Sequence, residues 1–304
     1  MATTRVLRGK TRQLVQYIDQ KVIVISKPPG VISQLQAGTR TQDDASGLLF
    51  ENSIDKIIDD LTLKLNLDTR PVPVHRLDKA TTGALLLGRT PDAVKSFSKQ
   101  FSSREISKTY LALVRGGRET FKTDQGNIIA KLGLDSHGRT QLQKDGTETS
   151  TTWELLASSP LAPISLLRLK LHTGFKHQLR VHLARILGAP ILGDSLHSQS
   201  KISEKILEVA KIPEDRLFLH SSNISFSRYR KATPRRYTVG VTAPLPKDFV
   251  QLCNAFGFKP DPEELHGVVT VNREPAPYNQ TDFETWYTHW RSGVNEWHSS
   301  KTET

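Results

Sequence analysis

Apolar residues recur every three to four positions in two stretches of the chain, which predicts two amphipathic helices. The first covers residues 51–65, where Ile54, Ile57, Ile58, Leu61 and Leu65 share one face. The second covers residues 91–101 and opens with Pro91, a residue that fits the first turn of a helix. The sequence therefore predicts one helix before and one after the apolar run at residues 84–87.

Short apolar and β-branched runs bounded by turn residues predict strands. These runs cover residues 21–26, 84–87, 108–114, 153–157, 167–171, 217–226 and 237–241. The polar stretch 117–150 predicts a hairpin region, residues 67–74 an extended segment, and the polar residues 33–47 a loop. From His177 the period changes to that of a helix, whose apolar stripe is Leu179, Leu183, Ile186 and Leu187. His177, Arg180 and Ala184 share a separate face, so Arg180 can point at a cleft while the leucines pack.

The charge balance indicates an anionic partner. Lys and Arg number 42 against 31 Asp and Glu, a net charge of +11. Residues 165–240 hold 14 basic residues against 5 acidic ones, whereas residues 241–304 hold 5 against 9. This segregation favours an RNA-binding surface over a merely soluble basic protein. The single cysteine, Cys253, excludes an internal disulfide framework and a cysteine-rich zinc site.

Two other features bear on location. The chain has no run of about 18 apolar residues, so we expect no membrane span. Residues 1–17 contain Arg5, Arg8, Lys10 and Arg12, several threonines and no acidic residue. This composition is typical of a mitochondrial targeting segment, with a basic RNA-binding arm or a disordered terminus as alternatives. We expect a mitochondrial location, with cytoplasm or nucleus as the alternatives.

Residues 75–83 read His-Arg-Leu-Asp-Lys-Ala-Thr-Thr-Gly and lead into the apolar run 84–87. Asp78 is the only acidic residue among His75, Arg76 and Lys79, which are basic or can become so. A carboxylate among cations is expected to be ionised. Such an aspartate can be a nucleophile, a metal ligand or half of a structural ion pair. Residue chemistry alone leaves these three roles open and favours the ion pair.

The order of residues 75–83 resembles the catalytic signature of the RluA family of pseudouridine synthases. Four further blocks in the family's order strengthen the resemblance over residues 20–245. They are Ser-Lys-Pro-Pro-Gly at 26–30, Ser-Lys-Thr-Tyr-Leu-Ala at 107–112, His-Thr-Gly-Phe-Lys-His-Gln-Leu-Arg at 172–180, and Leu-Phe-Leu-His at 217–220. Together these blocks are highly specific, although Arg-Leu-Asp alone would not be.

The resemblance implies an α+β fold with a mixed, largely antiparallel central sheet flanked by helices. We divide the chain into a basic segment, residues 1–17, a catalytic domain, residues 18–245, and a carboxy-terminal extension, residues 246–304. The implied activity is conversion of a specific uridine to pseudouridine in structured RNA. This isomerisation requires no cofactor and no metal, and we expect a monomer whose partner is RNA.

The resemblance assigns Asp78, Tyr110 and Arg180 to catalysis. Asp78 would be the nucleophile or would stabilise an oxocarbenium-like sugar, and Arg180 would pair with it across the cleft. Tyr110 would lie against the target base, although the residue considered without the resemblance is favoured as part of the core of its strand. RNA binding is assigned to Arg76, Lys108, Lys176, His177 and Gln178. Arg76 would fill the gap that the flipped base leaves in the RNA.

Three departures from the family pattern stand out. Thr82 replaces the usual serine, Phe175-Lys176 replaces a common Arg-Thr, and His197 closes a block that commonly reads Gly-Asp-x-x-Tyr. None removes a member of the catalytic trio.

Other functions fit the sequence less well. The block Gly-Asp-Ser-Leu at 193–196 matches a serine esterase block, but its place in the chain order is wrong. His172, His177 and His182 do not share one helix face, so a metal site is disfavoured. The remaining alternatives are a non-catalytic ribosomal RNA assembly factor and a transfer RNA enzyme. We expect large-subunit ribosomal RNA, in mitochondria, as the substrate.

Overall fold

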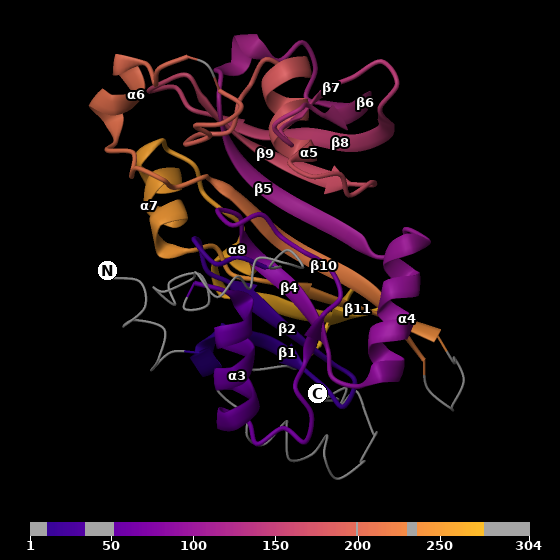
Figure 1. Ribbon diagram of the computed structural model, residues 1–304. Helices are drawn as coiled ribbons and strands as arrows, with labels where there is room; N and C mark the ends of the chain where they lie inside the picture. Colours follow the sequence, from indigo (N-terminus) through magenta and orange to yellow (C-terminus); the bar gives the residue numbers. More distant parts are fainter. Residues whose placement is uncertain (1–10, 34–51, 199, 230–235, 277–304) are drawn as a thin grey trace, which may run out of the picture.

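A long, continuous sheet forms the centre of the molecule (Figure 1). The computed structural model describes residues 11–33, 52–198, 200–229 and 236–276. The main path of the 13-stranded sheet runs through β1 (Val15–Ile18), β2 (Val22–Lys27), β4 (Thr82–Gly88), β10 (Leu219–Tyr229), β5 (Ser107–Arg115), β9 (Ile164–Leu171), β8 (Thr147–Ser158), β6 (Gln125–Leu134) and β7 (Thr140–Leu142). Off this path lie β3 (Val72–Pro73), β11 (Arg236–Thr242), β12 (Val268–Val271) and β13 (Glu274–Pro275).

The sheet is mixed and largely antiparallel, as the family resemblance implied. Strands β4 and β10 run parallel, with Thr82 opposite His220 and Gly83 opposite Ser221. The other strand pairs in the described part of the chain are antiparallel. The fold class predicted from the sequence is therefore confirmed.

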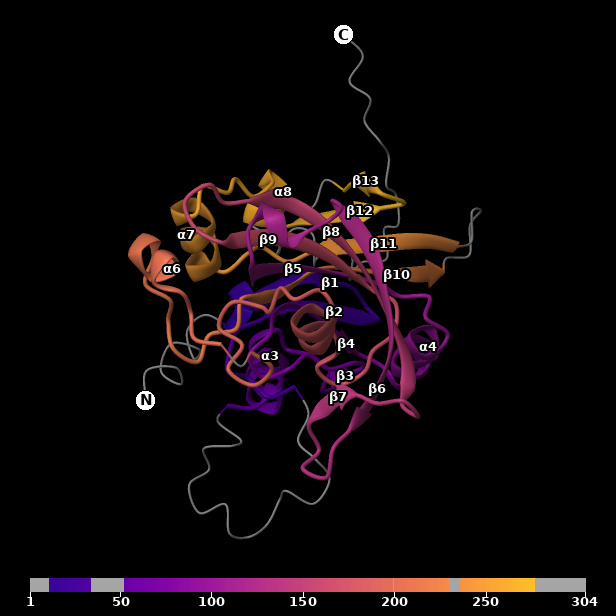
Figure 2. The same cartoon turned by 90° about the horizontal axis from the view of Figure 1, so that it is seen from above.

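Helices cover both faces of the sheet because successive strand residues point to opposite sides. Leu85 and Leu87 of β4 share a core with α3 (Ile54–Lys64) and α5 (Gln178–Val181). Leu86 belongs to a second core, on which α4 (Pro91–Ser102) packs. A third core beside β5 holds side chains of α6 (Glu204–Val209) and α7 (Lys247–Ala255). In Figures 1 and 2, α6 and α7 lie at one side of the molecule and α4 at the opposite side.

The two helices predicted from apolar spacing are confirmed as α3 and α4. The first turn of α4 contains Pro91, and the hydroxyl of Thr90 caps the helix by accepting a hydrogen bond from the backbone N–H of Ala93 at 3.2 Å. The helix predicted from His177 is α5, which has only four residues before a π-helical turn, η3 (His182–Ile186), continues it. The single-turn helices are η1 (Thr11–Leu14), η2 (Arg118–Thr120) and α8 (Pro262–His266).

The sheet continues past both predicted domain limits. At the amino-terminal end, η1 and β1 are part of the fold, and β1 pairs with β2. At the other end, β12 pairs with β11, and Phe249 and Phe256 of the extension are fully buried. Neither residue 17 nor residue 245 therefore marks a break in the structure. The basic residues Arg5, Arg8 and Lys10 and most of the predicted loop 33–47 lie outside the described residues.

The parallel pair of β4 and β10 fixes the place of the Asp78 loop, which leads directly into β4. Gly83 has φ of +105°, and a Cβ there would lie 2.2 Å from the carbonyl oxygen of Ser221. Beside it, the buried hydroxyl of Thr82 lies 2.9 Å from Nδ1 of His220. The Thr-Gly pair thus allows the two backbones to approach closely just after Asp78. In the described part of the chain, no helix is long and apolar enough to cross a membrane.

Candidate active site

The loop that carries Asp78 is anchored from behind. Its turn closes through the backbone N–H of Thr81, which donates to the carbonyl oxygen of Asp78 at 3.0 Å. The N–H of Gly30 donates to the carbonyl oxygen of Lys79 at 2.9 Å, and the N–H of Leu77 donates to Oγ of Ser33 at 3.3 Å. The segment at 26–30, to which Gly30 belongs, therefore supports this loop. From the sequence alone, this segment was only one of the blocks that resemble the family.

Lys27 is the centre of that support. Its side chain is fully buried, and Nζ donates to the carbonyl oxygens of Pro28, Val31 and Lys79 at 3.0, 3.0 and 3.1 Å. Burial lowers the pKa of Lys27 to about 7, against the opposing effect of the Asp78 charge. Three carbonyl acceptors compensate for the burial of the amine, so Lys27 ties the end of β2 to the Asp78 loop.

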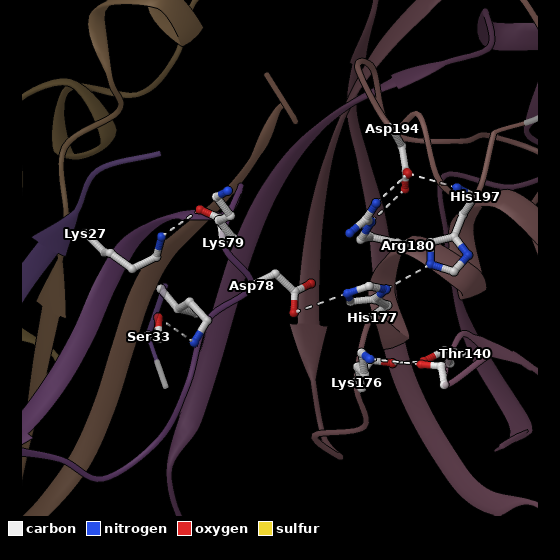
Figure 3. A network of polar contacts seen from close by, with 12 residues as sticks. Lys27, Ser33, Asp78, Lys79, Thr140, Lys176, His177, Arg180, Asp194 and His197 are labelled. Atoms are coloured by element: carbon white, nitrogen blue, oxygen red, sulfur yellow. Dashed lines mark hydrogen bonds and ion pairs between the residues drawn. The ribbon is translucent and has the colours of Figure 1, made fainter. Parts of the chain in front are cut away.

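The carboxylate of Asp78 faces α5 (Figure 3). Its Oδ1 lies 3.9 Å from Nε2 of His177, and the two side chains are 20% and 16% exposed. The environment differs from the cluster of cations expected from residues 75–79. His75 is neutral, because burial lowers its pKa to about 3, and its Nε2 accepts a hydrogen bond from the N–H of Leu86 at 3.0 Å. Asp78 thus has few partners and stays accessible.

Arg180 does not make the ion pair with Asp78 that the resemblance implied. Its Nε donates to Oδ2 of Asp194 at 2.9 Å and its Nη2 to Oδ1 at 2.7 Å. The expected two-pronged contact exists, but its partner is the carboxylate on the loop after α5. The reason is geometric: α5 is short, and the loop after η3 brings Asp194 next to the guanidinium, while His177 occupies the space nearest Asp78 (Figure 3).

Asp194 is saturated with hydrogen bonds. Besides Arg180, its Oδ1 accepts from the backbone N–H groups of Leu196 and His197, both at 3.0 Å. Burial alone would raise the pKa of Asp194, but the bonds and charge of Arg180 and the N–H of His197 outweigh it and lower the pKa. This ion pair holds Arg180 at the edge of the Asp78 cavity.

Two histidines connect this ion pair to Asp78. Nδ1 of His177 lies 3.1 Å from Nε2 of His197. Burial lowers the pKa of both rings, to about 4 for His197, so both are neutral at pH 7. One nitrogen of this bond must donate and the other accept. If Nε2 of His197 donates, Nδ1 of His177 accepts. The single ring proton of the neutral His177 then lies on its Nε2, the atom that faces Asp78. His177 has a left-handed backbone, φ 51°, directly before α5.

Asp78 opens into a cavity of about 290 Å³. The cavity is lined by Arg76, Leu77, Asp78, Thr81, Tyr110, Leu171, Gly174, Phe175, Lys176, His177, Gln178, Leu179, Arg180 and Leu219. Tyr110 comes from β5 and is buried. Burial and the charge of Asp78 raise its pKa, against the hydrogen bond with Ser221, so its hydroxyl stays protonated. The structure thus brings all three predicted catalytic residues to one cavity.

The predicted RNA-binding residues divide into two groups. Arg76, Lys176 and His177 line the Asp78 cavity, and Arg76 and Lys176 are exposed. Lys108 lies instead in a neighbouring cavity, which also contains Tyr110.

Gln178 has a different role from the predicted one. It is buried, its Nε2 donates to Ser150 and Thr151 at 3.0 Å each, and its Oε1 accepts from Thr173 and from the N–H of Phe175. Because both ends of the amide are used, Gln178 positions the loop that carries Phe175.

Asp194, His197 and Lys27 are the site residues that the sequence interpretation did not assign. Asp194 and His197 lie in the block compared with Gly-Asp-x-x-Tyr, and this match was the one signal that could have pointed to them. The carboxylate of Asp194, within the block compared with a serine esterase, is engaged by Arg180.

The sequence of the chain is similar to those of RNA pseudouridine synthases. The family described as RNA pseudouridylate synthase matches residues 21–185. Ribosomal large subunit pseudouridine synthase D of Borreliella burgdorferi is 32% identical over 238 residues, which cover 73% of this chain and 66% of that protein. An RNA pseudouridine synthase of Zymomonas mobilis, named without a substrate, is 31% identical over 240 residues, covering 78% of this chain and 96% of that protein.

Solved structures share the fold. Human RNA pseudouridylate synthase domain containing 4 superposes with a TM-score of 0.64 at 22% identity, covering 83% of this chain and 96% of that one. Human RNA pseudouridylate synthase domain containing 1 gives a TM-score of 0.53 at 21% identity, covering 82% and 96%. At these identities the likeness shows the fold alone.

Proposed function

The chain belongs to the RNA pseudouridine synthase family, and we propose that it converts one uridine of large-subunit ribosomal RNA to pseudouridine, with Asp78 as the reacting carboxylate. The observation that carries this proposal is the position of Asp78. It lies in a cavity of about 290 Å³ with Tyr110 and Arg180, and among the described residues the contact of its carboxylate is with His177, at 3.9 Å. A cavity of this size suits a single nucleoside extruded from the RNA.

The reaction breaks the bond between C1′ of the ribose and N1 of uracil and forms a bond between C1′ and C5. Asp78 supplies the negative charge, either by bonding to the reacting carbon or by stabilising the cationic sugar as the C–N bond breaks. The base must rotate within the cavity before C5 can bond. The proton that leaves C5 is balanced by the one that N1 gains, so no other reactant is consumed.

Each neighbour then has a distinct part. Tyr110 and Leu219 line the cavity and would hold the planar base while it rotates. Arg180, fixed by Asp194, would present its remaining donors to the base or the ribose. Arg76 is exposed at the rim, where it can enter the space in the RNA from which the uridine is drawn.

The choice of RNA rests on charge and on relatives. The net charge of +11 suits a phosphate-rich partner, and the Borreliella relative is named for the large ribosomal subunit. We extend the proposal to mitochondrial ribosomal RNA on the composition of residues 1–17. In this segment, Arg12 already lies in η1, within the fold.

The test is a map of pseudouridine by carbodiimide-dependent reverse-transcription stops, in cells with and without the gene. All ribosomal and transfer RNAs, mitochondrial and cytoplasmic, are compared. We expect one stop in mitochondrial large-subunit ribosomal RNA to disappear, to return with the wild-type gene and not with Asp78→Asn. A stop lost from cytoplasmic ribosomal RNA would correct the compartment, and one lost from transfer RNA would overturn the substrate.

A further inference from the structure

A second cavity, of about 560 Å³, adjoins the one that contains Asp78. The two share the lining residues Arg76, Tyr110, Leu171, Gly174 and Phe175. The second cavity extends from Tyr110 on β5 to Phe101 and Ser102 at the end of α4. In Figure 1, the last turn of α4 lies beside the start of β5. The proposed reaction uses only the first cavity, so the second has no role in it.

The second cavity is rich in cations that lack a carboxylate partner. Arg76, Arg104 and Lys108 line it, and in the part of the chain that the structure describes none of them forms an ion pair. Glu148 also lines the cavity; its side chain, like that of Arg104, is exposed, whereas Lys108 is half-buried. Burial lowers the pKa of Lys108, and the charge of Arg104 lowers it further. An anion bound between the two cations would relieve their repulsion.

The ammonium of Lys108 is held in place. It lies 5.9 Å from the centre of the Phe101 ring, within the range of a cation–π contact. The Phe101 ring is itself stacked with the ring of His75, at 4.7 Å between ring centres. Because burial keeps His75 neutral, this stack adds no charge of its own. The cavity therefore contains a positioned cation rather than a freely moving surface lysine.

Arg104 occupies a position that usually belongs to glycine. It follows the end of α4 with φ of +59°. Its N–H donates to the carbonyl oxygen of Phe101 at 3.1 Å, and the N–H of Glu105 donates to that of Gln100 at 2.9 Å, a pattern typical of a helix end that favours glycine. A side chain in this conformation is strained, by about 1 kcal/mol. The strain is explained if the guanidinium has a function in the cavity that it lines.

Phe175 provides an aromatic surface between the two cavities. It is half-buried and lines both of them. Gln178 fixes its backbone by accepting a hydrogen bond from its N–H at 3.1 Å. Phenylalanine here is one of the departures from the family pattern noted in the sequence.

We propose that the second cavity binds the nucleotide next to the target uridine, with Arg104 and Lys108 on its phosphate and Phe175 stacked on its base. The inference rests on the proposed function, because it requires an RNA strand that passes the Asp78 cavity. Adjacent nucleotides are joined by one phosphate, and the adjoining cavities share a wall, so one strand can occupy both. The bases on either side of Phe175 would be kept apart, which would hold the extruded uridine in its own cavity.

The test measures binding of fluorescein-labelled oligouridylate of ten nucleotides by anisotropy, over a range of salt concentrations. Arg104→Gly and Lys108→Met remove the charges, and Lys205→Ala is the control, since Lys205 is exposed on α6 and absent from the cavity lining. We expect each cavity variant to bind about tenfold more weakly and to reduce the salt slope by about one, with no change for the control. Arg104→Gly should melt no lower than wild type, because glycine tolerates the left-handed conformation.

A second probe separates the phosphate from the base. With an oligouridylate whose linkages are uncharged methylphosphonates, Arg104→Gly and Lys108→Met should bind like wild type, whereas Phe175→Leu should weaken both probes about fivefold. Unchanged affinity and salt slope in both charge variants would overturn the phosphate site. A loss of equal size on the uncharged probe would do the same, by showing that the charges do not meet phosphate.

This readout is independent of the ribosomal substrate. If no ribosomal RNA loses a pseudouridine but the variants bind oligouridylate as expected, the proposed substrate fails and the nucleotide site stands. If the ribosomal product is confirmed and the variants bind like wild type, the nucleotide site fails and the proposed substrate stands.

Discussion

Two aspartates contribute to the same site in opposite ways. Asp194 is fully buried, and its oxygens accept two bonds from Arg180 and two from backbone N–H groups. Asp78 is 20% exposed, and the contact of its carboxylate in the described part of the chain is with the neutral ring of His177, 3.9 Å away. Because the carboxylate of Asp194 is hydrogen-bonded on every side, it can stabilise the site but cannot react with the substrate. The one with unused lone pairs, facing a cavity, is free to meet the substrate.

The two residues also differ in what surrounds them. Asp194 stabilises the loop after α5, and through Arg180 it orders the wall of the cavity. Asp78 is instead positioned by its backbone, which Lys27, Ser33 and Gly30 hold from behind. The protein thus fixes the main chain of the reacting residue and leaves its carboxylate unoccupied. Substitutions should separate these two functions.

The largest effect on stability is expected from Asp194→Asn. The change leaves the 11%-exposed guanidinium of Arg180 without its counter-charge and with one acceptor in place of two. Loss of one partner of a buried ion pair costs about 3–5 kcal/mol, so the urea midpoint should fall sharply. Activity should fall as well, because Arg180 is no longer held at the cavity.

A matched control is Asp124→Asn. Asp124 also pairs with an arginine, Arg118, at 2.8 Å, but the two side chains are 72% and 55% exposed. This pair is screened by water, so its loss should cost no more than about 1 kcal/mol. Equal losses for the two variants would show that Asp194 has no special structural role.

Acid should destabilise the protein in two stages. Burial lowers the pKa of His182, His197 and His220 to about 4 each, so between pH 6.5 and 4 the unfolded chain binds protons that the folded chain does not. The stability that the neutral histidines contribute is therefore fully present above pH 6.5. It declines as the pH is lowered, by up to about 1.4 kcal/mol per pH unit for each histidine. The lowered pKa of Asp194 adds a further loss below about pH 4, where the unfolded aspartate becomes protonated.

Urea titrations at pH 7.5, 6, 5 and 4 measure this dependence directly. We expect the free energy of unfolding to decline at each step below pH 6.5. A constant value down to pH 4.5 would show that the buried histidines titrate normally.

A smaller effect is expected from His197→Phe, which removes the 3.1 Å bond to His177 and keeps the size of the ring. Without this bond the orientation and tautomer of His177 are no longer fixed, so the single-turnover rate should fall about tenfold while RNA affinity is unchanged. His197→Tyr offers a hydroxyl at a similar place and should recover most of the rate. Weaker RNA binding in both variants would instead assign His197 to substrate contact.

The sequence predicted those parts of the molecule that depend on local pattern. Apolar spacing was enough for α3 and α4, and the blocks at 75–83 and 107–112 placed Asp78 and Tyr110 in one site. Pairings across space were less accessible. Arg180 was expected to meet Asp78, since nothing in the linear order shows that Asp194 lies next to the guanidinium. That outcome depends on how the loop after α5 folds back.

The role of Gln178 shows the same limit. Its place in the arginine block suggested contact with RNA, but burial and four hydrogen bonds to the protein assign it to the loop at Phe175. Burial of a single polar side chain results from the packing of distant segments, here β8 and the loop 173–175. Residue type and spacing do not determine it.

The most direct test of the account compares wild type with Asp78→Asn in tritium release from RNA labelled with [5-³H]uridine, under single-turnover conditions. Tritium leaves C5 only if the new C–C bond forms. The account predicts that Asp78→Asn releases at least about 10⁴-fold more slowly, binds the RNA with unchanged affinity and unfolds at the wild-type urea concentration. Release by Asp78→Asn within tenfold of the wild-type rate would contradict the assignment of Asp78 as the reacting carboxylate.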